Sequence, residues 1–196
     1  PADLVAEGVR GYLRYWWSVF RLPALAPSTL AASVRLVGDG PARAHLAAGR
    51  SVVLFLGHMG DWDLAGAWSQ RHFAPVVTVA ERLEPEGMFR AFLDFRERLG
   101  MTIYPAEQGT YDRLLGHLRE GTPFVLPLLA DRDLTHRGVT VDFCGLPARM
   151  APGPAALALA ELLRAAARHA ASWAELPAAS RRLSEGEPAI PTQLLS

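Results

Sequence analysis

The stretch Ser51-Val52-Val53-Leu54-Phe55-Leu56-Gly57-His58-Met59-Gly60-Asp61-Trp62-Asp63 decides the fold of this chain. Its first six residues form an apolar run rich in β-branched and aromatic side chains, which is typical of a buried strand. Residues 61–72 have a helical pattern, and Asp61 occupies the expected N-cap position. The stretch therefore predicts a buried strand that leads into a helix through a short loop carrying His58.

The same alternation of strand and helix patterns continues along the chain. Further strands are predicted at 76–80, 101–104, 124–129 and 139–143. Helices are predicted at 3–21, 28–36, 41–49, 61–72, 85–99, 109–119 and 152–169. This alternation favours an α/β fold with a mainly parallel central sheet flanked by helices. The glycine- and proline-rich segment 143–155 is expected to be a loop.

Length and composition narrow the possible classes of protein. The 196 residues suffice for one domain with its own core. We expect residues 1–170 to form the α/β domain and residues 171–196, rich in Ala, Arg, Glu, Ser and Pro, to form a loosely ordered tail. The 20 basic and 20 acidic side chains balance, so no overall charge attracts nucleic acid. No apolar run reaches the ~18 residues of a membrane span, which favours a soluble or peripheral protein.

Three side chains form the candidate catalytic centre. His58 and Asp63 have a His-x4-Asp spacing, which on one continuous helix would place them about 140° apart. With His58 in the preceding loop and Asp63 in the first helical turn, the two can meet. Asp131 follows the strand 124–129 and therefore lies at the same edge of the sheet as His58. Either carboxylate could hold the imidazole and leave its other nitrogen free as a general base for acyl transfer. The alternative is a helix-capping Asp63 and an Asp131 paired with Arg132.

Other charged residues lie near the same sheet edge. Glu81 follows the strand 76–80 and could contact substrate hydroxyls. Arg96 and Arg98, on the helix 85–99, could hold an anionic head group, although solvated helix charges explain them equally well.

Aromatic residues cluster near the N-terminus of the sequence. Trp16, Trp17 and Phe20 lie between Arg14 and Arg21. Such a group fits an anchor on a membrane surface, and it also fits a part of the core.

Four stretches carry a resemblance to a known family. They are YLRYWWSVFRLP (12–23), VLFLGHMGDWDLAGAW (53–68), TVAERLEPEGMFRAFLDFRERLGM (78–101) and LLADRDLTHRGVTVDFCGLPARMAPGPAALAL (128–159). In them the chain resembles the bacterial lysophospholipid acyltransferase superfamily, in the branch of the lipid A late acyltransferases and the phosphatidylinositol mannoside acyltransferases. The resemblance implies an acyltransferase-like fold and transfer of a long-chain acyl group from acyl-CoA to a sugar hydroxyl of a membrane glycolipid.

The resemblance also implies roles for individual residues and a place in the cell. His58 matches the family's base, Asp63 its motif carboxylate, and Asp131 an acidic position, Glu in relatives, that orients the histidine. The implied substrate-binding residues are Glu81, Arg96, Arg132 and Arg149. The family acts without cofactor or metal, and the resemblance implies a peripheral protein at the cytoplasmic face of the cell membrane.

Two rival hypotheses remain at this point. The family continues beyond about residue 159 with further strands, so we expect a fold truncated at its C-terminal end and, as one alternative, a catalytically inactive fragment that binds lipid or acyl-CoA. A metal hydrolase using His58, Asp61 and Asp63 is the other, although the usual multi-ligand spacing is absent.

Overall fold

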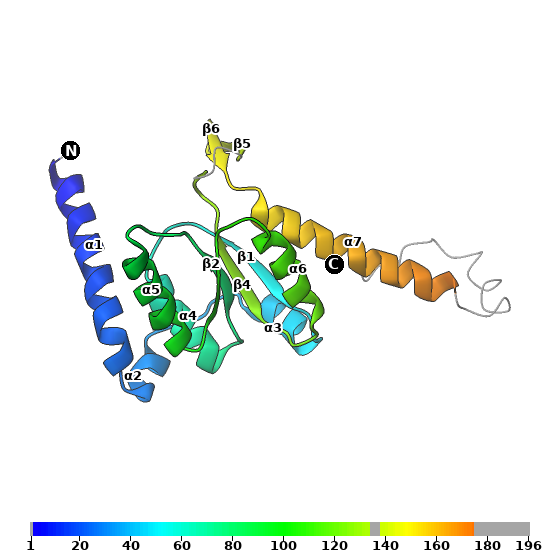
Figure 1. Ribbon diagram of the computed structural model, residues 1–196, viewed down its shortest axis with the longest axis horizontal. Coiled ribbons are helices and arrows are strands. Elements are labelled where there is room, and N and C mark those ends of the chain that lie inside the picture. The colour runs from blue at the N-terminus through cyan, green and yellow to red at the C-terminus, as the bar shows by residue number, and fades with distance from the viewer. Residues whose placement is uncertain (1, 134–137, 175–196) are drawn as a thin grey trace. The chain divides into compact units, whose positions relative to one another are not determined.

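The computed structural model describes residues 2–133 and 138–174 of the chain (Figure 1). The helices are α1 (Ala2–Arg21), the 3-10 turn η1 (Leu22–Ala24), α2 (Pro27–Ala32), α3 (Gly40–Ala47), α4 (Trp62–His72), α5 (Glu86–Arg98), α6 (Thr110–Arg119) and α7 (Gly153–Ala174). The strands are β1 (Val52–Leu56), β2 (Val77–Ala80), β3 (Thr102–Pro105), β4 (Val125–Leu129), β5 (Val139–Phe143) and β6 (Leu146–Met150). This confirms the expected α/β class.

The chain divides into two compact units, Pro1–Leu157 and Ala158–Ser196. The first unit holds all six strands of the described residues and the residues discussed below. The expected tail at 171–196 falls largely outside the described residues, since the description ends at residue 174.

Parallel strand pairs form the centre of the first unit. β1 pairs with β4 in a register that joins Val52 to Val125 and Leu56 to Leu129. β2 pairs in parallel with β3, and one parallel bridge between Val76 and Val125 brings β2 alongside β4. The strands therefore lie in the order β1, β4, β2, β3, and their carboxyl ends point to one edge.

A proline in β4 explains why β2 and β4 share only one bridge. The Val125 N–H donates to the carbonyl of Pro75, so backbone nitrogens two residues further along β4 point the same way, towards β2. That position is Pro127, which has no N–H to donate. Instead the Thr78 hydroxyl donates to the Pro127 carbonyl at 2.6 Å. A side chain thus joins the two strands where the backbone ladder is interrupted.

Both faces of the sheet are buried, because neighbouring β4 residues pack on opposite sides. Val125 packs with Phe89 of α5 in one cluster, together with Met101 and Ile103. Residues of the second cluster are Val77, Leu114, Phe124, Leu126, Leu128 and Leu157. Figure 1 shows α4 and α5 on one side of the strands and α6 on the other. This coverage explains why the strands are continuous apolar runs rather than alternating ones.

The prediction of a loop over residues 143–155 is wrong for part of this segment, because it contains the strand β6. β6 pairs antiparallel with β5 to form a hairpin. Cys144 and Gly145 connect the two strands, both with positive φ, 55° and 81°. Two such residues in succession match the twist of a tight hairpin. Gly145 and Pro147 interrupt the pattern of apolar and polar side chains at β6, so the sequence pattern does not predict this strand.

Helix α1 leaves an apolar stripe exposed. The exposed large side chains along it are Leu4, Val5, Val9, Tyr12, Leu13, Trp17 and Phe20. Trp16 turns inward and packs on Phe92 of α5, with ring centroids 5.6 Å apart. The aromatic cluster therefore serves both the core and the surface. Among the described helices, none is long and apolar enough to cross a membrane.

Candidate active site

The strand register makes His58 and Asp131 neighbours. Leu56 and Leu129 are paired at the ends of β1 and β4, and each functional residue lies two positions further on. The Asp131 carboxylate accepts the His58 backbone N–H at Oδ2, at 3.0 Å, and lies 2.5 Å from the ring Nδ1 through Oδ1. The side chains of both residues are partly exposed, 26% and 35%, so a ligand can reach them. Asp131 therefore fixes both the backbone and the ring of His58.

The second imidazole nitrogen faces an arginine. Arg132 Nη2 lies 3.1 Å from His58 Nε2. A guanidinium only donates, so Nε2 accepts here, and the ring proton sits on Nδ1, from which it is donated to Asp131. This tautomer leaves the lone pair of Nε2 as the proton acceptor of the site.

The bonds from His58 keep Asp131 ionised. Partial burial favours the neutral carboxyl, but the backbone and ring bonds from His58 outweigh it and hold the pKa of Asp131 below its ordinary value. These bonds stabilise the folded chain above the ordinary carboxyl pKa, and that contribution is lost as pH falls through the lowered pKa.

Asp63 lies in a buried ion pair. Its side chain is 1% exposed and accepts from Arg96 Nε at 2.7 Å and from the Tyr15 hydroxyl, also at 2.7 Å. We expected Asp63 to meet the imidazole, but its hydrogen bonds join α1, α4 and α5 instead. Among the carboxylates of the described residues, Asp131 is the one that holds the ring of His58.

The charges of this ion pair support one another. Burial opposes the charge on Arg96, but the Asp63 carboxylate outweighs it and raises the pKa of Arg96. Burial, and then the bond to Asp63, raises the pKa of Tyr15 well above its ordinary value. Tyr15 thus remains a neutral donor. Nothing in the sequence pattern marked Tyr15, because a tyrosine on a helix face does not reveal its partner in another element.

The loop between His58 and α4 is held from both ends. Gly60 has φ 71°, a conformation that favours glycine, and the Asp61 side chain caps α4 by accepting from the Leu64 N–H at 3.0 Å. The Trp62 ring meets the His58 ring edge-on, with centroids 6.0 Å apart, and lies against Tyr15 at 4.7 Å. Trp62 therefore connects the buried ion pair to the imidazole.

The three ligands of the metal-hydrolase hypothesis have separate partners. Asp61 caps a helix, Asp63 holds Arg96, and the His58 ring holds Asp131. No group of three or more potential ligands gathers within the described ranges 2–133 and 138–174. The geometry thus gives this hypothesis no support.

Glu81 and Arg149 are not joined to the imidazole. Glu81 follows β2 with an exposed side chain. Arg149, in β6, donates to the Asp133 carboxylate at 2.9 Å and to the Gly138 carbonyl at 2.7 Å. Arg149 therefore fastens the hairpin to the segment that follows Asp131. Arg98 is exposed near the end of α5.

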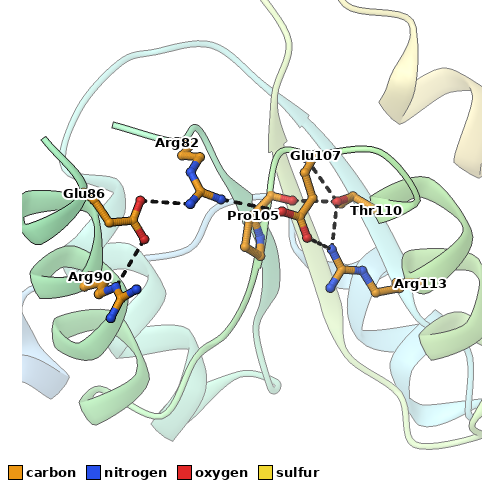
Figure 2. Close-up of polar contacts among 7 residues, drawn as sticks. All are labelled: Arg82, Glu86, Arg90, Pro105, Glu107, Thr110 and Arg113. Carbon is orange, nitrogen blue, oxygen red and sulfur yellow. Dashed lines mark hydrogen bonds and ion pairs between the residues drawn. The ribbon is translucent and has the colours of Figure 1, made fainter. Parts of the chain in front are cut away.

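A network of exposed charges crosses the neighbouring part of the sheet edge (Figure 2). Arg82 follows β2 and lies between Glu86, at 2.9 Å, and Glu107, at 3.8 Å. Glu107 follows β3 and accepts from Arg113 of α6 at 2.6 Å. Next to these charges, the buried Thr110 hydroxyl donates to the Pro105 carbonyl. The network joins the β2–α5 connection to the β3–α6 connection.

We expect Thr110 to contribute more stability than Glu107. Glu107→Gln should change the free energy of unfolding by less than about 1 kcal/mol, because exposed ion pairs contribute little. Thr110→Val should cost about 1–3 kcal/mol, because it removes a buried hydroxyl that donates to the Pro105 carbonyl and accepts from the Glu107 N–H. Urea denaturation of the two variants checks this order, and equal costs would contradict it.

Comparison with known proteins identifies the family. The model of the family "Bacterial lipid A biosynthesis acyltransferase" matches residues 1–165. The chain is 41% identical over 162 residues to the phosphatidylinositol mannoside acyltransferase of Mycolicibacterium smegmatis, covering 81% of this chain and 53% of that protein. It is 43% identical over 164 residues to the enzyme of the same name from Mycobacterium tuberculosis, covering 81% and 51%. The chain spans about half the length of these relatives.

The matched region, residues 1–165, contains α1, every strand, the imidazole with its two partners and the buried ion pair. The chain belongs to the bacterial lipid A biosynthesis acyltransferase family.

Proposed function

We propose that this chain carries the catalytic centre of an acyltransferase that moves a long-chain fatty acyl group from acyl-CoA to a sugar hydroxyl of a phosphatidylinositol mannoside. Two relatives that bear this activity in their names match four-fifths of the chain. The observation that carries the proposal is the imidazole at the sheet edge, with Asp131 on Nδ1 and a proton-accepting lone pair on Nε2, which the Arg132 guanidinium contacts.

The proposed reaction proceeds through His58. Nε2 removes the proton of the sugar hydroxyl while the oxygen attacks the thioester carbonyl, forming the new C–O bond. Asp131 stabilises the imidazolium that results. The C–S bond then breaks, and the leaving thiolate takes the proton from Nε2. The ester and free CoA are the products, and the base returns to its starting state.

The oxyanion formed in this step needs a donor. The backbone N–H groups near Gly60 and the guanidinium of Arg132 are the candidates at this position. We also propose that Glu81 and Arg149 bind substrate at the rim, since both follow or adjoin the sheet edge that carries His58. For Asp63 and Arg96 we propose that they position the loop of His58 through Trp62.

The reaction is tested with the purified chain, palmitoyl-CoA and a panel of glycolipid acceptors. Release of free thiol that depends on a phosphatidylinositol mannoside, with formation of the acylated lipid, is the expected result. Binding of palmitoyl-CoA without any product would favour the alternative of an inactive binding fragment, which the length of the chain relative to its relatives makes a real competitor.

We further propose that the protein is peripheral and binds the cytoplasmic face of the cell membrane through α1. Val5, Val9, Leu13 and Trp17 recur every four residues and are all exposed, so they form one stripe along the helix. Arg10 and Arg14 flank Leu13 and Trp17 in a shallow cleft. An apolar stripe beside arginines fits an interfacial helix on an anionic lipid surface.

Vesicle binding tests this placement of α1. The double variant Trp17→Ser/Phe20→Ser should weaken binding to vesicles containing phosphatidylinositol by at least about tenfold, because each side chain loses roughly 1.5–3 kcal/mol of apolar burial. Val37, outside α1, is 84% exposed and provides the matched control Val37→Ser. Equal sedimentation of the double variant and the parent chain with vesicles would contradict the proposal.

A further inference from the structure

Arg132 has an unusual set of contacts for a charged side chain. Within the described part of the chain, its only hydrogen-bond partner is Nε2 of His58. Among the described residues it forms no ion pair with its neighbour Asp131, whose carboxylate instead accepts from the backbone and the ring of His58. The remaining N–H groups of the guanidinium therefore face outward at the exposed edge of the sheet.

This contact conflicts with the proposed chemistry unless Arg132 moves. Nε2 has one lone pair, and a sugar hydroxyl cannot deliver its proton to a lone pair that already accepts from a guanidinium. The guanidinium also opposes a second positive charge on the ring. In the unliganded protein the guanidinium of Arg132 therefore covers the proton-accepting nitrogen of His58.

A phosphate oxygen is the partner that can draw the guanidinium away. A guanidinium is attracted to the charge of a phosphate and can form two parallel hydrogen bonds with its oxygens. Neutral imidazole offers only one acceptor. Resting on the function proposed above, both substrates carry phosphate, the donor in its nucleotide part and the acceptor in its phosphodiester.

We propose that Arg132 covers the proton-accepting nitrogen of His58 in the unliganded protein and passes to a phosphate oxygen of the bound substrate, which uncovers the base. The base is then active only beside a bound phosphate. This arrangement prevents His58 from activating water while the site lacks its ligand.

The test follows the His58 ring by NMR with ¹⁵N-labelled histidine, using His58→Gln to assign its signals. The charged group in contact with the ring besides Arg132 is Asp131, and the third neighbour is the uncharged Trp62 ring. Arg132→Met removes the guanidinium, Arg132→Lys keeps the charge without the fork, and Arg71→Met is a matched loss of an exposed arginine at the far end of α4.

In Arg132→Met the Nε2 signal should move from its position in the parent chain, because the guanidinium no longer donates to that nitrogen. Arg71→Met should match the parent, and Arg132→Lys should fall between the two. A non-transferable thioether analogue of palmitoyl-CoA and, separately, phosphatidylinositol micelles are then added to the parent. The ligand that supplies the phosphate should move the Nε2 signal to its position in Arg132→Met, whereas inorganic phosphate at equal concentration tests for simple ion binding.

Each outcome decides the proposal. An Nε2 signal at the same position in the parent chain and in Arg132→Met, or one that neither phospholigand moves, overturns it. An equal response to inorganic phosphate overturns the assignment to a substrate phosphate. These readouts do not depend on turnover. If the Nε2 signal moves both in Arg132→Met and on addition of a phospholigand, but the chain transfers no acyl group, the proposed function is wrong and this inference stands. If the chain transfers acyl groups and Arg132→Met leaves kcat/KM unaltered, the proposed function stands and this inference is wrong.

Discussion

Replacement of His58 by alanine is expected to lower kcat for acyl transfer by about 10²- to 10⁴-fold, which is the usual contribution of a general base. The His58 side chain is 26% exposed and lies at the edge of the sheet rather than in either core cluster, so the variant should remain folded. The measurement is thiol release from palmitoyl-CoA in the presence of glycolipid acceptor, with circular dichroism as the check on folding.

Two further variants sharpen this result. His72→Gln, at the opposite end of α4, changes a histidine away from the site and should retain the activity of the parent chain. Asp131→Asn should lose less activity than His58→Ala, since it removes the carboxylate that holds the ring and stabilises the imidazolium but keeps the base itself. Full turnover in His58→Ala would eliminate the proposed mechanism.

Loss of the Asp63 carboxylate should produce the largest change in stability. Asp63→Ala leaves the guanidinium of Arg96, whose side chain is 17% exposed, without its partner. Breaking a buried ion pair in this way costs about 3–5 kcal/mol. The free energy of unfolding from urea denaturation measures the cost. Tyr15→Phe, which removes one hydrogen bond to a charged group, should cost only about 1.5–3 kcal/mol.

The double variant Asp63→Leu/Arg96→Met provides the control for this interpretation. It removes both charges together, so no unpaired charge remains buried, and its stability should recover most of the loss seen in Asp63→Ala. The acid limb of kcat/KM should stay where it is in the parent chain if Asp63 acts by positioning the loop. A shifted limb would instead indicate that Asp63 acts electrostatically on the base. Additive losses in the double variant would show that the pair is not energetically coupled.

Much of the site follows from local sequence patterns. Apolar runs before His58 and Asp131 predicted two buried parallel strands, and strands of that kind end at the same edge. The position of Asp61 before a helical pattern predicted its role as a cap, which the bond to the Leu64 N–H confirms. Local geometry suffices for these features, because a strand or cap depends on residues within a few positions.

Local patterns did not predict which side chains from different helices and strands form hydrogen bonds or ion pairs with one another. The spacing of His58 and Asp63 permitted a contact, yet Asp63 turns to Arg96 and Tyr15. Proximity in sequence also suggested that Arg132 would pair with Asp131, but that carboxylate accepts from His58, and the Arg132 guanidinium lies on the other nitrogen of the same ring. For both Asp63 and Asp131, the sequence offered more than one possible partner for the carboxylate.

The sequence by itself determined which residues reach the carboxyl edge of the sheet, because continuous apolar runs specify the strands and the polar residues that follow them mark the strand ends. Only the tertiary structure decided which of those residues touch. Asp63 has little access to water, and a buried carboxylate must find a cation wherever the packing of α1, α4 and α5 supplies one. That choice depends on distances between helices, which no pattern within a single element contains.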